Sequence, residues 1–211
     1  MQPGLTNVGA GRTSFLFQIN VTRRCQLRCS HCYILSDKKD TSPDMSEAEF
    51  LHVVQGIVDH MKLDYEFSRR YTFVDIHVIG GEPSMLGVDF FKAALPKAKA
   101  MLSEIPQEVA FSIVTNLVTH EALEVARLFD KVATSYERST RFNKRKQEEI
   151  WKNNVRTLMA ESKNPSLPGP KDFSVTTALV KPVVQAGAVS MIEELVAVSY
   201  THLRAHETRG N

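Results

Sequence analysis

The chain of 211 residues contains only three cysteines, and all of them lie within eight consecutive positions, at Cys25, Cys29 and Cys32. An odd cluster of thiols with no partner elsewhere cannot close a framework of structural disulfides. The opening residues, MQPGLTNVGAGRTS, also lack the basic and then apolar pattern of a secretory signal. Both absences favour a reducing compartment, so we expect the protein in the cytoplasm.

Two further features are missing: a long apolar run and an excess of charge of one sign. No apolar run approaches the roughly 18 residues that indicate a membrane span. Lys and Arg number 26 against 24 for Asp and Glu, which leaves a formal net charge of +2. We therefore expect neither a membrane nor a nucleic acid as a partner. The length suits one domain, because domains usually contain about 50 to 250 residues.

Hydrophobic periodicity predicts strands and helices that alternate along the chain. Apolar, β-prone runs predict five strands, at 14–22, 71–79, 108–117, 131–137 and 172–180. Helical spacing predicts five helices, at 46–61, 87–104, 119–130, 143–162 and 187–198. Pro96 is expected to kink or split the second helix. Strands alternating with helices imply right-handed crossovers on a parallel sheet, which curl toward a barrel or a doubly wound form.

The first predicted helix has a clear beginning and a clear buried side. Ser46 is followed three residues later by Glu49, the pattern of a capping box. Apolar residues then recur at helical spacing, at Phe50, Val54, Ile57 and Met61. This spacing is typical of a helix that packs one side against a core.

The three cysteines follow the first predicted strand with the spacing C-x3-C-x2-C. Offsets of four and seven residues let three thiolates converge on one metal centre, and both iron and zinc accept thiolate ligands. Zinc bound by the three cysteines and His31 is one alternative, although His31 directly precedes Cys32 and adjacent ligands close a tetrahedron awkwardly. Three unliganded thiols are another. A [4Fe–4S] cluster held by three cysteines would leave one iron open for chemistry.

The segment CQLRCSHCY resembles the signature of radical S-adenosylmethionine (radical SAM) enzymes, in which such a loop follows the first strand of a partial (β/α)6 barrel. The resemblance implies that Cys25, Cys29 and Cys32 each bind one iron of a [4Fe–4S] cluster. It implies that the fourth iron takes the amino nitrogen and carboxylate of S-adenosylmethionine. His31 occupies the position whose ring usually lies near the adenine.

A second motif, GGEP at Gly80, Gly81, Glu82 and Pro83, stands where the second strand should end. It is similar to the family segment whose backbone and glutamate hold the methionine amino group. Two glycines let the backbone approach a ligand closely, and Glu82 offers an anionic acceptor to an ammonium group. An ordinary turn between strand and helix is the alternative for this motif on its own.

Polar residues close the third and fourth predicted strands. Asn116, which follows Thr115, and Ser135 stand at strand ends that face ligands in such barrels. The resemblance assigns them to the ribose, the carboxylate or the substrate, and turn formation or helix capping is the alternative. Peptide-modifying members of the family carry SxDG where this chain carries SYER at 135–138.

A basic run follows, at Arg141, Lys144, Arg145 and Lys146. Its simplest interpretation is a solvated helix start, and a contact to phosphate or to an acidic peptide is the alternative.

The final residues, VSYTHLRAHETRGN, differ in character from the segment before them, and they show no apolar residues at helical spacing. They resemble a translated sequencing adapter more than a sixth barrel strand. We therefore expect an N-terminal extension at 1–13, an incomplete radical SAM core of about five β/α units at 14–198 with the sixth strand missing, and a non-native tail at 199–211.

The resemblance implies an oxidoreductase-type radical enzyme. Its reduced cluster would cleave S-adenosylmethionine and generate a 5′-deoxyadenosyl radical that abstracts hydrogen, with electrons from a donor such as flavodoxin or ferredoxin. The expected substrate is a peptide or protein. Enzymes of nucleotide or cofactor biosynthesis are the alternative, as is a non-catalytic metal-binding fragment. The sequence names no acid, base or radical-quenching residue.

Overall fold

The computed structural model describes residues 13–29, 32, 42–137, 141–142, 144–164, 166–167, 169–178, 187, 189, 193 and 203–206. Its strands are β1 (Ser14–Thr22), β2 (Phe73–Gly80), β3 (Glu108–Val114), β4 (Lys131–Tyr136), β5 (Asp172–Ala178) and β6 (Leu203–His206). Its helices are α1 (Glu47–Leu63), α2 (Tyr65–Ser68), the 3-10 turn η2 (Pro83–Leu86), α3 (Val88–Leu102), α4 (His120–Ala126) and α5 (Arg145–Ser162). The helix predicted at 187–198 lies outside these residues except at Gly187, Val189 and Glu193.

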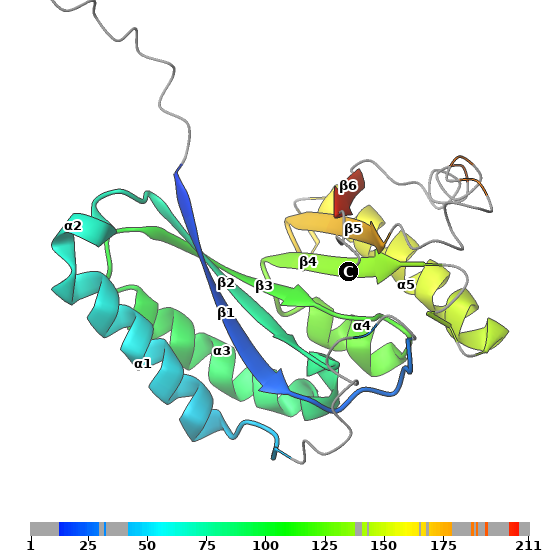
Figure 1. The fold of residues 1–211 in the computed structure, drawn as a ribbon, viewed down its shortest axis with the longest axis horizontal. Coiled ribbons are helices and arrows are strands. Elements are labelled where there is room, and N and C mark those ends of the chain that lie inside the picture. Colours follow the sequence, from blue (N-terminus) through cyan, green and yellow to red (C-terminus); the bar gives the residue numbers. More distant parts are fainter. Residues whose placement is uncertain are drawn as a thin grey trace, which may run out of the picture.

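The strands form one parallel sheet in sequence order, β1-β2-β3-β4-β5-β6. The helices α1, α3, α4 and α5 lie along one face of this sheet (Figure 1). Within the described residues β6 does not pair with β1, so the sheet stays open. This arrangement confirms the predicted fold class, an α/β fold with a partial (β/α)6 barrel.

The core lies between the sheet and the helices because each element buries one side. In β2 the residues Val74, Ile76 and Val78 alternate along the strand and are 0% exposed. The four apolar residues predicted to form the buried side of α1 are all buried. The capping box of Ser46 and Glu49 is present at its start. In this half of the chain, the residues that the sequence pattern predicts to be buried are therefore the residues that tertiary packing buries.

Pro96 does not split the second long helix. Helix α3 continues through it from Val88 to Leu102. Leu95 and Ala98, on either side of the proline, are buried in the core. Their packing holds the helix together although Pro96 lacks the N–H for one main-chain hydrogen bond.

The sixth strand is a correction to the sequence analysis, which expected it to be missing. Residues 203–206 pair with β5 in parallel, with Val175 opposite Leu203 and Ala178 opposite His206. The sequence LRAH has no alternating apolar pattern and so gives no strand signal. An open sheet edge needs only main-chain N–H and C=O groups from the segment that joins it. That residues 199–211 are non-native remains a prediction about their origin.

Among the described residues, none of the helices combines the length and the apolar character that crossing a lipid bilayer requires.

A charged cluster on the sheet face opposite the helices makes a testable contribution to stability. The Asp75 carboxylate, whose side chain is 15% exposed, accepts hydrogen bonds from Lys131 Nζ at 2.7 Å and from Ser112 Oγ. Burial alone would raise its pKa, but hydrogen bonds from His77, Lys131 and Ser112 outweigh burial and lower the pKa to about 2. The carboxylate is thus more acidic in the folded than in the unfolded chain.

We expect Asp75→Asn to lower the free energy of unfolding at pH 7 by about 2 kcal/mol, the equivalent of this pKa shift. A carboxyl with a lowered pKa stabilises the fold above its unfolded value of 3.8 and loses that contribution as the pH falls toward about 2. The difference between wild type and variant, measured by urea unfolding, should therefore shrink below pH 4. A difference that stays constant down to pH 2.5 would contradict this assignment.

Candidate functional site

The candidate site is formed by loops that follow the carboxyl ends of β1, β2 and β3. The cysteine loop, residues 23–32, follows β1, the GGEP turn follows β2, and Thr115 and Asn116 follow β3. Carboxyl ends of neighbouring parallel strands meet at one edge of a sheet, which is where α/β barrels place their active sites. The fold therefore brings together three motifs that the sequence separates by up to about 90 residues.

In the described part of the cysteine loop, residues 23–29 and 32, Leu27 is buried. Leu27 is 1% exposed, and its N–H points to Cys25 Sγ at 3.4 Å. The N–H of Cys32 donates to the carbonyl of Cys29 at 3.1 Å. The thiol of Cys29 lies 3.8 Å from the carbonyl oxygen of Arg141. All three cysteines are free and partly buried, as ligands of an enclosed centre would be.

Burial raises the pKa of the Cys25 thiol, against the lowering effect of the Leu27 N–H and the Asn116 side chain. Burial also raises the pKa of Cys29, against the lowering effect of the Arg141 charge. Without a metal both residues are therefore neutral thiols at pH 7. A metal that binds them must displace their protons.

Thiol chemistry and position fit an iron–sulfur centre, but the sulfurs are not gathered around one point. In the described part of the chain no three His, Cys, Asp or Glu side chains are placed so that they could hold a metal ion. His31, predicted near the adenine and weighed as a zinc ligand, lies outside the described residues. Amide donors directed at Cys25 Sγ are the kind of contact that tunes cluster sulfurs.

The glycines of the GGEP turn lie against the cysteine loop. The N–H of Gly81 donates to Thr22 O at 2.7 Å, and the N–H of Glu82 donates to Arg24 O at 2.7 Å. A Cβ atom on Gly81 would stand 2.3 Å from Arg24 O and 2.6 Å from the carbonyl of Arg23. The glycines were predicted to let the backbone approach a ligand closely. In this structure the backbone of the GGEP turn closely approaches the cysteine loop.

Glu82 is completely buried, and its carboxylate connects the end of β2 to the end of β3 through hydrogen bonds. Its Oε1 accepts hydrogen bonds from Ser84 N at 3.2 Å, Ser84 Oγ at 2.7 Å and Thr115 Oγ1 at 2.6 Å. Its Oε2 accepts one, from Asn116 N at 2.6 Å. Burial raises the pKa of this carboxyl, and these donors lower it. Pro83, also buried, begins η2 directly after Glu82.

Asn116 joins the GGEP turn to the cysteine loop. Its Nδ2 lies 3.7 Å from Cys25 Sγ, and its Oδ1 accepts from Gln26 Nε2 at 3.3 Å. The next residue, Leu117, has φ of +54° and is fully buried. Left-handed backbone at a leucine is uncommon and persists where its surroundings enforce it.

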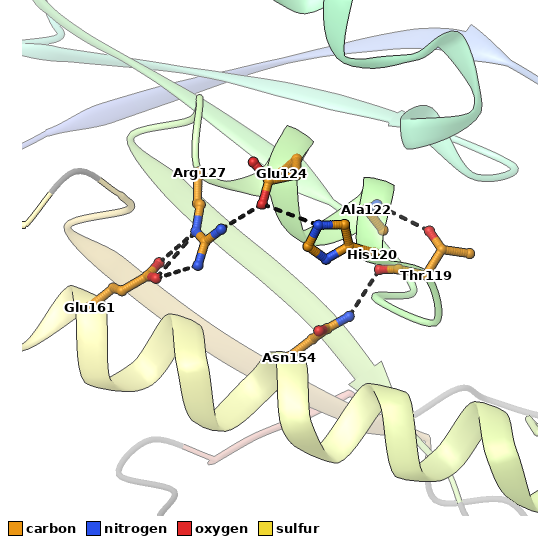
Figure 2. A network of polar contacts seen from close by, with 7 residues as sticks. All are labelled: Thr119, His120, Ala122, Glu124, Arg127, Asn154 and Glu161. Carbon is orange, nitrogen blue, oxygen red and sulfur yellow. Dashed lines mark hydrogen bonds and ion pairs between the residues drawn. The ribbon is translucent and has the colours of Figure 1, made fainter.

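Contacts from helix α5 help to hold Leu117 in this backbone conformation (Figure 2). The buried Asn154 donates from Nδ2 to Leu117 O at 3.0 Å and to Thr119 O at 2.9 Å. Arg127, the C-cap residue of α4, reaches across to Glu161 on α5 and donates from Nη2 to Oε1 at 2.6 Å. These contacts hold the turn after β3 between two helices.

Ser135 lies on β4, opposite Thr176 of β5, and is half-buried. No hydrogen bond of its side chain is found within the described residues. Asn116 contacts the cysteine loop and the GGEP turn directly, whereas Ser135 contacts neither through a hydrogen bond. Its predicted cofactor role stays a prediction.

Arg141 is a residue that the sequence analysis misplaced. It was predicted to belong to a solvated helix start, and Lys144, Arg145 and Lys146 are indeed exposed. Arg141 is only 8% exposed, and its Nε has no hydrogen-bond partner within the described part of the chain. The neighbouring Phe142 packs on Tyr136 and Trp151, with ring centroids 6.0 Å apart in both cases. The packing of Phe142 on these two rings buries the neighbouring Arg141.

The buried guanidinium faces the candidate site. Burial lowers the pKa of Arg141, while Cys29, Glu82 and Cys25 raise it when they are ionised. A guanidinium remains charged even so. The site therefore contains an incompletely paired cation at the boundary of the cysteine loop and the GGEP turn. No signal in the basic run marks Arg141 as different from its neighbours, except the aromatic residue that follows it.

Neither a protein-family profile nor a curated protein sequence matches the chain. Among solved structures it is similar to anSMEcpe with bound AdoMet (S-adenosylmethionine), at a TM-score of 0.69 and 12% identity over 92% of this chain and 49% of that one. It is also similar to anSMEcpe with bound AdoMet and Cp18Cys peptide, at a TM-score of 0.59, 12% identity, and 94% and 53% coverage. A third similar structure is Streptococcus suis SuiB, at a TM-score of 0.56, 11% identity, and 94% and 41% coverage.

The chain thus spans about half the length of anSMEcpe and about two fifths of the length of SuiB. The chain shares their fold, and the edge of the sheet that carries Cys25, Glu82 and Asn116 is the edge that its own sequence motifs marked. The protein therefore has the fold of these solved structures, an α/β fold with an open, partial-barrel sheet as the sequence analysis predicted.

Proposed function

We propose that the protein is a radical SAM enzyme that binds a [4Fe–4S] cluster and AdoMet and generates a 5′-deoxyadenosyl radical. One observation carries the proposal: the cysteine loop, the GGEP turn and the turn after β3 form one hydrogen-bonded unit. Asn116 links Cys25 to Glu82, and the N–H of Glu82 donates to the carbonyl of Arg24 in the cysteine loop. A turn that merely connected β2 to α3 would need none of these contacts.

In this proposal Cys25, Cys29 and Cys32 hold the cluster. A cluster held there would supply the electron for reductive cleavage of the AdoMet sulfonium, and the protein's own residues would supply orientation and exclusion of water. The N–H of Leu27 and the side chain of Asn116 donate toward Cys25 Sγ and so hold this ligand in place. The neutral thiols release protons as they bind iron.

AdoMet carries an ammonium and a carboxylate, and the site offers one group for each. A carboxylate oxygen accepts about two hydrogen bonds, so Oε2 of Glu82, with one donor, has capacity for the ammonium. The Arg141 guanidinium would hold the carboxylate, because its Nε is buried without a partner in the described residues. His31, Gly80, Pro83 and Ser135 complete the proposed cofactor-binding residues.

We infer that the substrate is a peptide or protein. anSMEcpe, whose structure this chain resembles, has been solved with the Cp18Cys peptide. An electron donor such as flavodoxin or ferredoxin would serve the cluster. A nucleotide or cofactor precursor as substrate is the predicted alternative. The other alternative, a metal-binding fragment without turnover, is an outcome of the experiments below.

The proposal is tested on protein purified without oxygen and reconstituted with iron and sulfide. We expect about four irons and four sulfides per chain, as a [4Fe–4S] cluster requires. With dithionite and AdoMet the protein should then form 5′-deoxyadenosine. Cys29→Ala and Cys29→Ser should each lose the cluster and the product, because no other cysteine can replace the ligand.

Each remaining outcome separates one alternative. Zinc in place of iron would overturn the iron assignment. A normal cluster in Cys29→Ala would contradict its ligand role. Full iron content without cleavage would show a metal-binding fragment that lacks turnover.

A further inference from the structure

Asn154 is a buried polar residue of α5 that the proposed function does not use. It is 7% exposed, and its Nδ2 donates to Leu117 O at 3.0 Å and to Thr119 O at 2.9 Å. Figure 2 shows the second of these contacts, which runs from α5 to the residue before α4. A side-chain amide has two N–H groups. Asn154 therefore uses both of them on one short turn and fixes that turn against the helix.

The turn after β3, residues 115–119, needs support because of its backbone. Leu117 is fully buried with φ of +54°, and a bulky residue keeps such a conformation only where its surroundings enforce it. Within the turn, the N–H of Val118 donates to Asn116 Oδ1 at 3.1 Å, and the N–H of Leu117 donates to Thr115 Oγ1 at 3.4 Å. These bonds use N–H groups of the turn, whereas Asn154 bonds to its carbonyl groups.

The other side of the same turn reaches the candidate site through Asn116. Its N–H donates to Glu82 Oε2 at 2.6 Å, and its Nδ2 lies 3.7 Å from Cys25 Sγ. Thr119, at the far end of the turn, is fixed as the N-cap of α4. A rotation of the backbone at Leu117 would therefore move both donors of Asn116 away from the groups they hold.

Helix α5 is itself anchored on both sides of Asn154. Trp151, three residues earlier, is fully buried and donates from Nε1 to Thr134 Oγ1 of β4 at 3.1 Å. Glu161, seven residues later, accepts from Arg127 Nη2 at 2.6 Å. The helix that carries Asn154 is thus fixed to β4 and to the end of α4. A support on such a rigid element positions a site more precisely than a support on a loop.

Resting on the function proposed above, we propose that Asn154 is a positioning residue of the active site, which holds the turn after β3 so that Asn116 reaches Cys25 and Glu82. Both hydrogen bonds of Asn154 go to the turn. It therefore acts on a cluster ligand and on the acceptor of the AdoMet ammonium only through the backbone of Leu117. Residues behind metal ligands commonly have this role, because they orient the ligands and tune the centre.

The loss of this support should change the cluster without removing it. Asn154→Ala keeps all three cysteines, so the iron content should stay at about four per chain. A hydrogen bond to Cys25 Sγ stabilises the reduced, more negatively charged cluster, so its loss should lower the midpoint potential. Glu82 would also lose a hydrogen bond that orients it. We therefore expect AdoMet binding to weaken by roughly tenfold or more.

Hydrogen exchange on the protein without a cluster tests the first step directly. The N–H of Asn116 donates to a buried carboxylate, so it should exchange slowly in the wild type. We expect Asn154→Ala to accelerate its exchange by roughly tenfold or more, the effect of losing a buried hydrogen bond. NMR on isotope-labelled protein measures this exchange. A redox titration followed by electron paramagnetic resonance and calorimetry with AdoMet measure the other two effects on reconstituted protein.

Asn153→Ala is the matched control, since Asn153 is the neighbouring asparagine of α5 and is exposed. It should leave exchange, potential and AdoMet affinity unchanged. Asp75→Asn controls for a general loss of stability. Asp75 accepts hydrogen bonds from Ser112 and Lys131, which lie outside the turn. This variant should therefore destabilise the fold and leave the midpoint potential and the AdoMet affinity unchanged.

Asn154→Ser is the milder variant, because a hydroxyl donates only one hydrogen bond. It should show all three changes in smaller measure, so the test does not depend on the folding of Asn154→Ala. A folded Asn154 variant with wild-type exchange at Asn116 and the wild-type midpoint potential would overturn the proposal. An equal fall of the potential in Asp75→Asn would overturn it as well, because the effect would then follow from stability alone.

These outcomes separate the positioning role from the proposed function. Exchange at Asn116 is measured without cluster or AdoMet, whereas 5′-deoxyadenosine formation is measured on the reconstituted wild type. If the wild type cleaves AdoMet and Asn154→Ala equals it in exchange and potential, the positioning role alone is disproved. A wild-type protein that loads no iron disproves the proposed function, whatever the exchange at Asn116.

Discussion

Gly81→Ala is expected to lose most of its capacity for iron and to lower the free energy of unfolding by about 2 to 3 kcal/mol. The added Cβ would stand 2.3 Å from the carbonyl oxygen of Arg24 and 2.6 Å from that of Arg23. Both neighbours are backbone atoms, which cannot rotate away as a side chain would. The cysteine loop must therefore shift as a unit, and it carries Cys25 with it.

Gly56→Ala is the matched control for this substitution. Gly56 lies in helix α1, and nothing stands within 4 Å of a Cβ atom built there. Alanine favours a helix interior over glycine by about 1 kcal/mol, so this variant should be slightly more stable and should load iron normally. Urea unfolding and iron analysis measure both effects. A Gly81→Ala protein with wild-type stability and iron content would refute the contact between turn and loop.

The elements were predictable from the sequence because their signals are local. Strand 14–22 was predicted with the bounds that β1 has, and the capping box of Ser46 and Glu49 forms as its spacing indicated. Alternation of strands and helices leaves few topologies, since crossovers are right-handed and sequential strands tend to be neighbours. The sequential parallel sheet follows from that rule.

The contacts within the site could not be predicted, because they depend on which strand ends meet. The sequence indicated Glu82 and Asn116 as separate cofactor-binding residues, but it could not show that each hydrogen-bonds to the other's loop. The same holds for the glycine pair, whose close neighbour is the cysteine loop. β6 was missed for a different reason: pairing at a sheet edge uses the backbone and leaves no pattern in the side chains.

Arg141 is the clearest case in which the pattern of charges in the sequence did not predict the environment of a side chain. Four basic residues within six positions indicate a solvated surface, and three of them are exposed. The fourth is buried because Phe142 packs against Trp151 and Tyr136. Tertiary packing of one aromatic residue thus decides the environment of the charge beside it. The second large expected effect depends on that charge.

Arg141→Met is expected to weaken AdoMet binding by roughly 30-fold or more, the effect of about 2 kcal/mol for the loss of a buried charge pair. The same change should leave the protein without AdoMet at least as stable as the wild type. A buried cation with an unpartnered Nε has a desolvation cost, and methionine fills a similar volume without it. Calorimetric titration with AdoMet and thermal unfolding without it measure the two effects.

Opposite signs in affinity and stability distinguish a ligand-binding arginine from a structural one. If Arg141 served only the fold, its loss would lower stability and affinity together, which would contradict the assignment. Arg145→Met is the matched control, because Arg145 follows in the same basic run with its side chain 90% exposed, and we expect it to change neither quantity. A residue held at a cost to stability beside Cys29 and Glu82 is best explained by the anion it receives there.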